Sequence, residues 1–301
     1  MLDMAGQWRV EAPDIPAADA AVAGQPIAAA RALLEQARGP YHAAQMAAFD
    51  LATGRRPDAA AQSREMRREH LTQIFMAWPH ALGLRPTFDQ SWLTDDDRVM
   101  RALFGAPARV PTNDFDTAGY LGSEDGIAPL LRLIGDLFGP RTAVADGLPL
   151  IDADTAFRPA PVENSCAARQ AASPAMDYVE AMYGRGPLWR ATGRVVDLAR
   201  MLTAETPPRP VTIAPGQILA PSARGYVALR IETEGERVTS FARVTPSDHL
   251  LAKGGALEVM LARLPAERGG LVPLLMTLID PCRPVSVEPV RPPGIPLPPV
   301  G

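Results

Sequence analysis

Cysteine is scarce in this chain of 301 residues, which contains only Cys166 and Cys282. Two cysteines are too few for the disulfide framework of a small secreted domain, so we expect both thiols to be free and reduced. Long hydrophobic runs are also lacking, because the longest strongly apolar run, 271–279, is too short to span a bilayer. The sequence therefore predicts neither a disulfide-rich scaffold nor a membrane-spanning protein.

Positive charge is not in excess either. The 30 Lys and Arg residues against 34 Asp and Glu residues give a formal net charge of -4 at pH 7. This balance lacks the basic footprint of a nucleic-acid-binding protein, and no block of like charge indicates an interaction tail. The first residues, MLDMAGQWRVEAPD, have no basic segment followed by an apolar one, which predicts no signal peptide. We therefore expect a cytoplasmic protein that binds neither nucleic acid nor a membrane.

Common enzyme motifs are absent from the sequence as well. It has no Gly-rich phosphate loop, no GxSxG nucleophile turn, no HExxH zinc helix and no CxxC pair. The histidines, at positions 42, 70, 80 and 249, do not have the spacing of metal ligands. Hydrophobic residues make up 47% of the chain, which is ample for a large core. Any function must therefore rest on less common motifs.

The spacing of apolar residues predicts an α+β protein that is mainly helical. The predicted helices cover residues 27–37, 41–52, 58–78, 95–104, 127–138, 174–183, 188–203, 255–264 and 270–279. Alternating apolar and polar residues predict strands at 6–12, 206–213, 226–234 and 237–244, the last two joined in a hairpin at Glu234-Gly235. Pro79 is expected to end the long helix at Trp78.

These elements predict one domain over residues 1–288, helical in 1–205 and built from a small antiparallel β-unit plus helices in 206–288. Residues 141–165, rich in Pro and Asp, are predicted to be irregular. The tail, residues 289–301, is predicted to be an exposed, polyproline-like segment.

Three short motifs in the last third occur in an order that resembles a known family. Ala223-Arg224-Gly225 precedes the predicted hairpin, Pro246-Ser247 follows it, and Asp280-Pro281-Cys282 ends the last helix. In this order and at comparable spacing they resemble the C-terminal half of nickel–iron hydrogenase large subunits. The N-terminal GQWRVE and the segment VENSCAAR resemble the same family more weakly. The resemblance implies a large-subunit-like fold.

The chain departs from that family where the metals are held. In the enzymes four cysteines hold the metals, and the first pair would fall on Arg38 and Tyr41. At the C-terminus Cys282 is kept, but Val285 replaces the second cysteine and Glu288 the terminal histidine. One thiolate cannot bridge a nickel–iron centre, because soft metals need several thiolates to be held tightly. The chain is therefore a degenerate relative and not a working hydrogenase.

Degenerate relatives that keep Asp-Pro-Cys include the HupK/HoxV-type hydrogenase maturation proteins, and the chain resembles this group. The resemblance implies a non-catalytic scaffold or chaperone for assembly of the iron group Fe(CN)2(CO) and its transfer into the hydrogenase large subunit. The implied partners are that large subunit and the Hyp-type maturation proteins. The implied cargo is transient and contains iron but no nickel.

The same resemblance implies roles for individual residues. Cys282 would bind the iron as thiolate, the form of cysteine that ligates metals. Arg224, a permanent cation with several donors, would bond to a cyanide nitrogen, and Ser247, next to Pro246, would donate its hydroxyl to the second cyanide. A single thiolate binds iron less tightly than a cage of several, which suits a carrier that must release its cargo. Arg38 and Tyr41 are expected to line the far side of this pocket.

Other interpretations of these residues stay open. Cys282 is also compatible with an inert buried thiol, Arg224 with a turn residue in an ion pair, and Ser247 with the N-cap region of a helix. An enzyme with Cys282 as nucleophile and His249 as base requires the two side chains within hydrogen-bond reach. A metal-free pseudoenzyme would bind the maturation partners and need no thiol chemistry. Cys166 is interpreted as structural.

Overall fold

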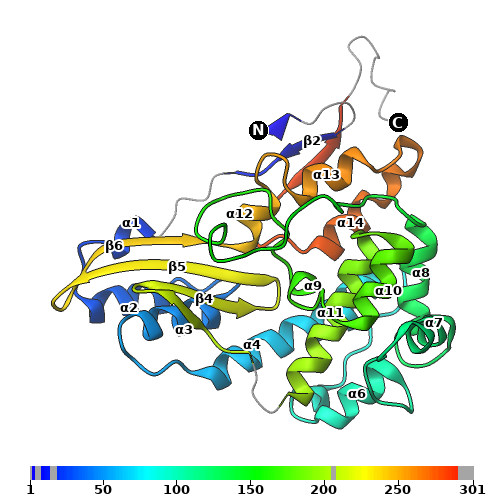
Figure 1. Ribbon diagram of the computed structural model, residues 1–301, viewed down its shortest axis with the longest axis horizontal. Helices are drawn as coiled ribbons and strands as arrows, with labels where there is room; N and C mark the ends of the chain where they lie inside the picture. The colour runs from blue at the N-terminus through cyan, green and yellow to red at the C-terminus, as the bar shows by residue number, and fades with distance from the viewer. Residues whose placement is uncertain (1, 4–7, 14–18, 205–207, 291–301) are drawn as a thin grey trace, which may run out of the picture.

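The chain forms an α+β structure in which helices predominate, and the computed structural model describes residues 2–3, 8–13, 19–204 and 208–290 (Figure 1). The N-terminal helices are α1 (Asp19–Val22), α2 (Ile27–Gln36), α3 (His42–Ala52), α4 (Ala59–Thr72) and α5 (Trp78–Ala81). The middle helices are α6 (Asp96–Phe104), α7 (Asp114–Gly122), α8 (Ala128–Phe138), α9 (Cys166–Arg169), α10 (Pro174–Tyr183) and α11 (Pro187–Thr203). The C-terminal helices are α12 (Pro246–Leu250), α13 (Ala256–Ala262) and α14 (Val272–Ile279), and short 3-10 turns occupy Gln90–Leu93 and Ala266–Leu271.

Two small antiparallel sheets complete the fold. One has the order β3 (Val211–Ala214), β4 (Gln217–Ser222), β5 (Gly225–Glu234) and β6 (Arg237–Val244). The other has the order β1 (Leu2–Asp3), β2 (Trp8–Glu11) and β7 (Ser286–Pro289). The predicted α+β class and the hairpin at Glu234-Gly235 are confirmed. Strands β1, β4 and β7 were not predicted. In β4, Pro221 interrupts the pattern, and proline usually indicates an edge or the absence of a strand.

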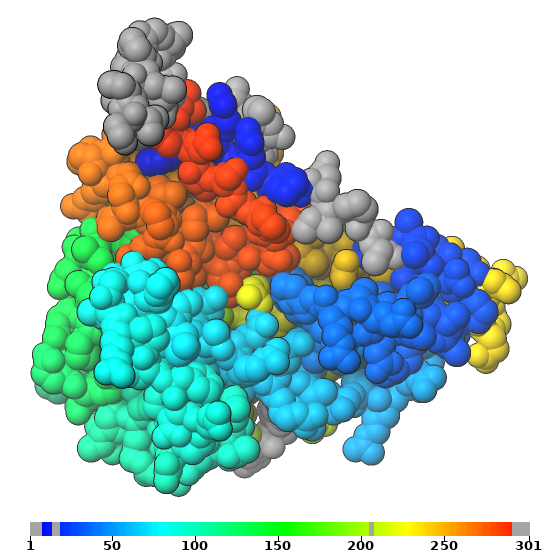
Figure 2. All heavy atoms as spheres, turned by 180° about the vertical axis from the view of Figure 1, so that it is seen from behind, coloured from blue at the N-terminus to red at the C-terminus, as the bar shows by residue number. Residues whose placement is uncertain are grey.

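The two ends of the chain meet in the second sheet. Strand β7 pairs with β2 in antiparallel register, with Glu288 opposite Arg9 and Pro289 opposite Trp8. Figures 1 and 2 both show the N-terminal segment, in blue, against the C-terminal segment, in red. Pro289, the first residue of the predicted exposed tail, is therefore the last residue of a paired strand. Residues 291–301 of that tail lie outside the described residues.

The long N-terminal helix does not end before Pro79 as predicted. It passes from α4 through a π-helical turn, Gln73–Ala77, into α5 and ends at Ala81. Proline has no N–H and cannot bond to the carbonyl four residues earlier, which belongs to Phe75. That carbonyl instead accepts the N–H of Thr87 at 3.0 Å. The π turn and this external donor therefore let the helix continue past a buried proline.

The remaining helix predictions hold to within a residue or a few, but α1, α7, α9 and α12 were not predicted as helices. These helices are short or poor in apolar residues, so their periodicity is weak. Residues 141–165 are irregular, as predicted, apart from an isolated bridge between Leu150 and Glu163. No helix within the described residues has the length and apolar character needed to cross a membrane.

Helix α11 runs through the larger hydrophobic core, and its buried residues lie all around its axis. Its polar residues Arg190, Arg194 and Asp197 are therefore inside the protein, where each charge needs a partner. At Gly193 a Cβ atom would lie 2.5 Å from the Cα of Ala167 in α9, so glycine permits close contact of the two helices. A second core lies between α2, α3 and the strands β4 to β6 (Figure 1). Helix α3, whose buried apolar residues belong to the second core, and helix α4, whose buried apolar residues belong to the larger core, carry part of the site.

Candidate functional site

The segment Asp280-Pro281-Cys282 turns sharply away from the end of α14. Asp280 adopts a left-handed conformation, with φ 54 and ψ 60, that ends the helix. Asp and Asn are among the few residues other than glycine that visit this region routinely. Pro281 cannot continue a helix, and Cys282 follows as a free, partly buried cysteine. The thiol is therefore presented on a fixed turn and is not sealed in the core.

Ser247 holds the Cys282 backbone in place. The Ser247 Oγ accepts the N–H of Cys282 at 2.8 Å, so the hydroxyl proton of this buried serine stays available as a donor. Ser247 lies in the first turn of α12, directly after Pro246. Proline is suited to the first position of a helix, because the N–H that it lacks would have no partner within the helix. Asp248 and Thr245 close a capping box at this helix end, with a 2.8 Å bond from the Thr245 N–H. The alternative N-cap role thus belongs to Thr245, and Ser247 contacts the Cys282 segment.

Arg224 joins the same segment from the turn between β4 and β5. Its Nη2 donates to Asp280 Oδ1 at 3.0 Å, and its Nε donates to the Asp280 carbonyl at 3.2 Å. Its Nη1 pairs with the Glu69 carboxylate, and its guanidinium lies 5.7 Å from the centre of the Tyr41 ring. Burial lowers the pKa of Arg224, but Asp280 and Glu69 outweigh it and raise the pKa above its ordinary value. Arg224 is therefore a fixed positive charge in a partly buried ion-pair network.

Asp280 has a larger role than sequence reasoning gave it. Its Oδ2 also accepts from Arg194 Nη2 at 3.0 Å, so one carboxylate neutralises two arginines. Neither Arg194 nor Glu69 was singled out from the sequence, because they lie 86 residues from Asp280 and 155 residues from Arg224, respectively. The available signal was the Asp-Pro pair itself, since an aspartate at a helix C-terminus is unfavourable for the helix dipole without a cation nearby.

Tyr41, at the start of α3, also lies beside Cys282. Its hydroxyl faces Cys282 and Ser247, is buried, and has no hydrogen-bond partner among the described residues. Burial, and then the neighbouring Cys282, raise the pKa of Tyr41 well above 10.0, so the group remains a neutral donor. The structure thus brings Cys282, Ser247, Arg224 and Tyr41 together. Arg38, expected beside Tyr41, instead lines a neighbouring groove.

His249 is engaged away from Cys282. Its Nδ1 bonds to Asn164 Nδ2 at 3.0 Å, and its Nε2 faces the carbonyls of Thr155 and Arg158 at 3.3 and 3.1 Å. Nε2 therefore carries the proton, and Nδ1 accepts from the amide. No hydrogen bond joins His249 to Cys282 in the part of the chain that the structure describes. The arrangement gives His249 a structural role in place of the general-base role weighed from the sequence.

The turn that carries Arg224 needs glycine at its end. Gly225 has φ 144, and a Cβ there would lie 2.5 Å from the backbone oxygen of Asn164. The Asn164 side chain bonds to Tyr226 on both sides, donating to its carbonyl at 2.9 Å and accepting its N–H at 2.7 Å. The segment VENSCAAR is therefore packed directly against the Ala-Arg-Gly turn.

A buried polar cluster contacts the turn between β4 and β5. Arg169 forms a bidentate pair with Asp197, at 2.8 and 2.6 Å, and its Nη2 also donates to the Ser222 carbonyl at 2.9 Å. His70 Nε2 donates to Asp197 at 2.9 Å. Burial lowers the pKa of His70 to about 4 despite the carboxylate, so the ring is neutral at pH 7. Burial raises the pKa of Asp197, but Arg169 and His70 outweigh it and hold the pKa well below its usual range.

This cluster also contains a possible set of metal ligands. Ligand atoms of His70, Cys166 and Asp197 lie within 4.8 Å of one another, and all three residues are buried. Asp197, however, already accepts from His70, Arg169 and Gln170, the last at 2.7 Å. Burial raises the pKa of the Cys166 thiol, which disfavours the thiolate that a metal requires. The geometry therefore fits a hydrogen-bonded structural cluster better than a metal site.

Comparison with known proteins gives one clear relationship. The chain is 40% identical over 279 residues to the hydrogenase expression/formation protein HupK of Rhodobacter capsulatus. The similarity covers 92% of this chain and 91% of the relative, so it includes nearly all the elements described above. No model of a protein family matches the chain.

Proposed function

Because the chain belongs to the family of the hydrogenase expression/formation protein HupK, we propose that it acts in hydrogenase maturation as a scaffold for the iron group Fe(CN)2(CO). The chain holds this cargo on Cys282 before its transfer into the large subunit of a nickel–iron hydrogenase. It works in the cytoplasm with that subunit and with the Hyp-type maturation proteins, and it catalyses no reaction of its own.

One observation carries the proposal: a partly buried thiol lies among three polar side chains that suit a cyanide-bearing iron. Cys282 is fixed by Ser247, and the hydroxyls of Ser247 and Tyr41 both lie beside it. The Tyr41 hydroxyl is buried without a partner among the described residues, which is costly unless a ligand supplies an acceptor. Cyanide nitrogen is such an acceptor. The Arg224 guanidinium adds a fixed positive charge for an anionic cargo.

The missing ligands support a carrier in place of an enzyme. Val285, at the position of the second cysteine, is apolar and packs against the larger core. Glu288, at the position of the terminal histidine, lies in β7 opposite Arg9. Neither residue offers the soft donor that nickel prefers in this setting. A single thiolate holds the iron group loosely enough for exchange with a partner that offers several.

The test is metal analysis with infrared spectroscopy of the protein co-produced with the maturation proteins. The native chain should contain iron and show bands in the cyanide and carbon monoxide stretching regions. Cys282→Ala should lose both signals. Cys166→Ala is the matched control, because it removes the other free thiol, which is buried in the structural cluster. Its iron and bands should persist.

Two results would overturn the proposal. Iron and both band sets in Cys282→Ala would remove the thiol from the site. Full hydrogenase maturation by Cys282→Ala in a strain that lacks the native protein would favour a metal-free chaperone. In that case the chain would act through its surface alone, and the cluster around Cys282 would be a remnant of the ancestral site.

A further inference from the structure

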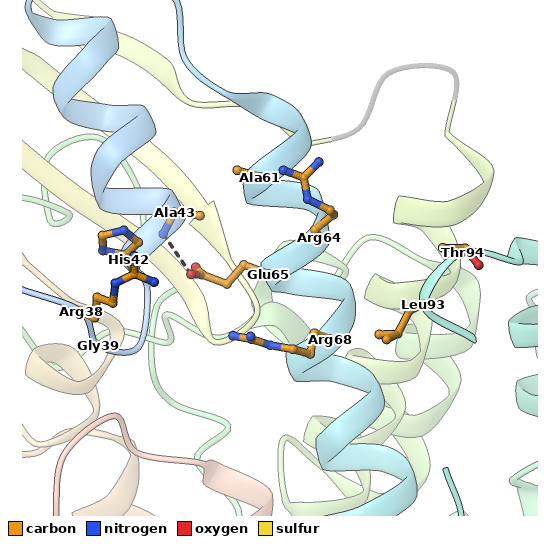
Figure 3. A pocket seen from close by; sticks show the side chains of 10 residues that line it. All are labelled: Arg38, Gly39, His42, Ala43, Ala61, Arg64, Glu65, Arg68, Leu93 and Thr94. Atoms are coloured by element: carbon orange, nitrogen blue, oxygen red, sulfur yellow. Dashed lines mark hydrogen bonds between the residues drawn. The ribbon is translucent and has the colours of Figure 1, made fainter. Parts of the chain in front are cut away.

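A groove lined by arginines lies between the start of α3 and the face of α4 (Figure 3). Its volume is about 780 Å³, within the range of sites that hold a ligand or a short peptide segment. Arg64 and Arg68 lie one turn apart on α4, and Arg38 approaches from the loop before α3. The other lining residues are Gly39, His42, Ala43, Ala61, Glu65, Leu93 and Thr94.

The positive charge of this groove is only partly offset within the described residues, because Glu65 is the one carboxylate among its lining residues. No carboxylate there forms a salt bridge with Arg38, Arg64 or Arg68, although the whole chain has a net charge of -4. Glu65 lines the groove, but its carboxylate accepts the N–H of Ala43 at 3.0 Å (Figure 3). Its charge is therefore directed to the positive end of α3, where a carboxylate is stabilising. The three guanidiniums remain available to an anionic ligand.

We propose that this groove binds an acidic peptide segment of a partner protein, whose carboxylates pair with Arg38, Arg64 and Arg68. Guanidinium and carboxylate match in a bidentate geometry, and charges at intervals along the groove suit a chain of spaced carboxylates. A nucleotide is less well matched. The lining contains no tyrosine, tryptophan or phenylalanine on which a base could stack, and no Gly-rich loop for phosphates.

The groove adjoins the Cys282 cluster through two shared elements. In the loop before α3, Arg38 and Gly39 line the groove, whereas Tyr41 turns its hydroxyl to Cys282. On α4, Glu65 and Arg68 line the groove, whereas Glu69 pairs with Arg224. A segment bound here would position its protein beside the thiol. In this respect the inference rests on the proposed function and names the surface by which a partner reaches the cargo.

The probe is a fluorescein-labelled octaglutamate peptide, titrated with the full chain and followed by anisotropy. Octaglutamine is the neutral control ligand, and ATP and pyrophosphate are competitors. The variant R38Q/R64Q/R68Q removes the three charges. The matched control R56Q/R85Q/R101Q removes three exposed arginines that lie outside this groove and, like the groove arginines, form no salt bridge among the described residues.

Octaglutamate should bind the native chain and the control variant, whereas octaglutamine should not. Exposed ion pairs contribute about 0.5 kcal/mol each, or about twofold in affinity, so the variant that lacks all three should bind octaglutamate about tenfold more weakly. Raising the salt from about 0.01 M to about 1 M should abolish binding, because it shortens the Debye length from about 30 Å to about 3 Å. The His42 imidazole provides a local signal by NMR. Its pKa should rise when octaglutamate is added to a chain that retains the three arginines, and it should not rise in the groove variant.

Equal affinity of the two variants, no octaglutamate binding, or preferential binding of ATP would each overturn the proposal. The outcome is separable from that of the iron experiment. Cys282→Ser should bind octaglutamate normally if the groove is a docking site, whether or not the thiol carries iron. Conversely, the groove variant should contain normal iron when co-produced with the maturation proteins but should mature less hydrogenase.

Discussion

Replacing Asp280 by Asn tests the ion-pair network that fixes the Cys282 segment. The Asp280 side chain is 9% exposed, and its partners Arg194 and Arg224 are 4% and 14% exposed. Removal of one partner from a buried pair costs about 3–5 kcal/mol, because the remaining charge is left uncompensated. Arg224 keeps Glu69, and the amide keeps one acceptor oxygen. We therefore expect a loss near the lower end, about 3 kcal/mol, in the free energy of unfolding.

The assay is urea unfolding followed by circular dichroism, with Asp96→Asn as control. Asp96 pairs with Arg67 at 2.5 Å but is 53% exposed, so its loss should cost no more than about 1 kcal/mol. Asp280→Gly and Asp280→Ala separate charge from backbone conformation. Both lose the carboxylate, but only alanine resists the left-handed turn, by about 1 kcal/mol or more. If Asp280→Asn costs no more than Asp96→Asn, the network does not stabilise the segment and the reasoning fails.

Four other changes test single features of the fold. Between pH 6.5 and about 4 the unfolded chain protonates His70 and the folded chain does not, so the free energy of unfolding should fall by up to about 3 kcal/mol as the pH drops. Urea titrations at several pH values should show a flatter dependence of this free energy on pH in His70→Gln. Tyr41→Phe should raise the free energy of unfolding of the cargo-free chain by about 1 kcal/mol, since it removes a buried hydroxyl that has no partner among the described residues, and it should shift the infrared cyanide bands. Gly193→Ala should cost about 1–3 kcal/mol by overpacking, whereas Gly119→Ala, with open space around it, should gain about 0.5–1 kcal/mol in thermal unfolding. Intact mass should show that the peptide after Glu288 stays attached, because proline follows and the nickel ligands are missing.

Each of these outcomes has a distinct counter-result. Equal pH slopes in the native chain and His70→Gln would show that this histidine protonates in the folded state. Unchanged cyanide bands in Tyr41→Phe would remove its hydroxyl from the cargo site. A neutral Gly193→Ala would mean that α9 and α11 separate at little cost. A species ending at Glu288 would show processing like that of the enzyme and contradict the proposed role.

The local sequence pattern was sufficient to predict most helices and the hairpin, because the spacing of apolar residues and the residues that end a helix are local properties. It failed at Pro79, where a hydrogen bond from distant Thr87 rescues the carbonyl that the proline leaves without a donor. It also missed strand β4, whose pairing with β5 outweighs the presence of Pro221. Tertiary contacts overrode local preference in both cases.

The candidate site was partly predictable for the same reason. The motifs containing Arg224, Ser247 and Cys282 are short and contiguous, and the fold brings them together. The partners that fix them come from elsewhere in the chain, and charge alone does not identify which carboxylate lies opposite which arginine. His249 shows the limit most directly. It lies two residues from Ser247, yet its ring nitrogens bond to Asn164 and to the carbonyl of Arg158 and not to Cys282.

The pairing of β7 with β2 determines the order in which the protein can be completed during synthesis. Strand β2 leaves the ribosome well before its partner β7, because the paired residues Glu11 and Ser286 are 275 residues apart. The entropic cost of closing the long loop between β2 and β7 is moderate, because this cost grows only with the logarithm of loop length. The Cys282 segment lies between α14 and β7, so it becomes anchored on both sides only after β7 has been made and has paired with β2. A nascent or truncated chain that stops before Ser286 has the thiol but not the β-strand pairing that anchors the segment downstream of it.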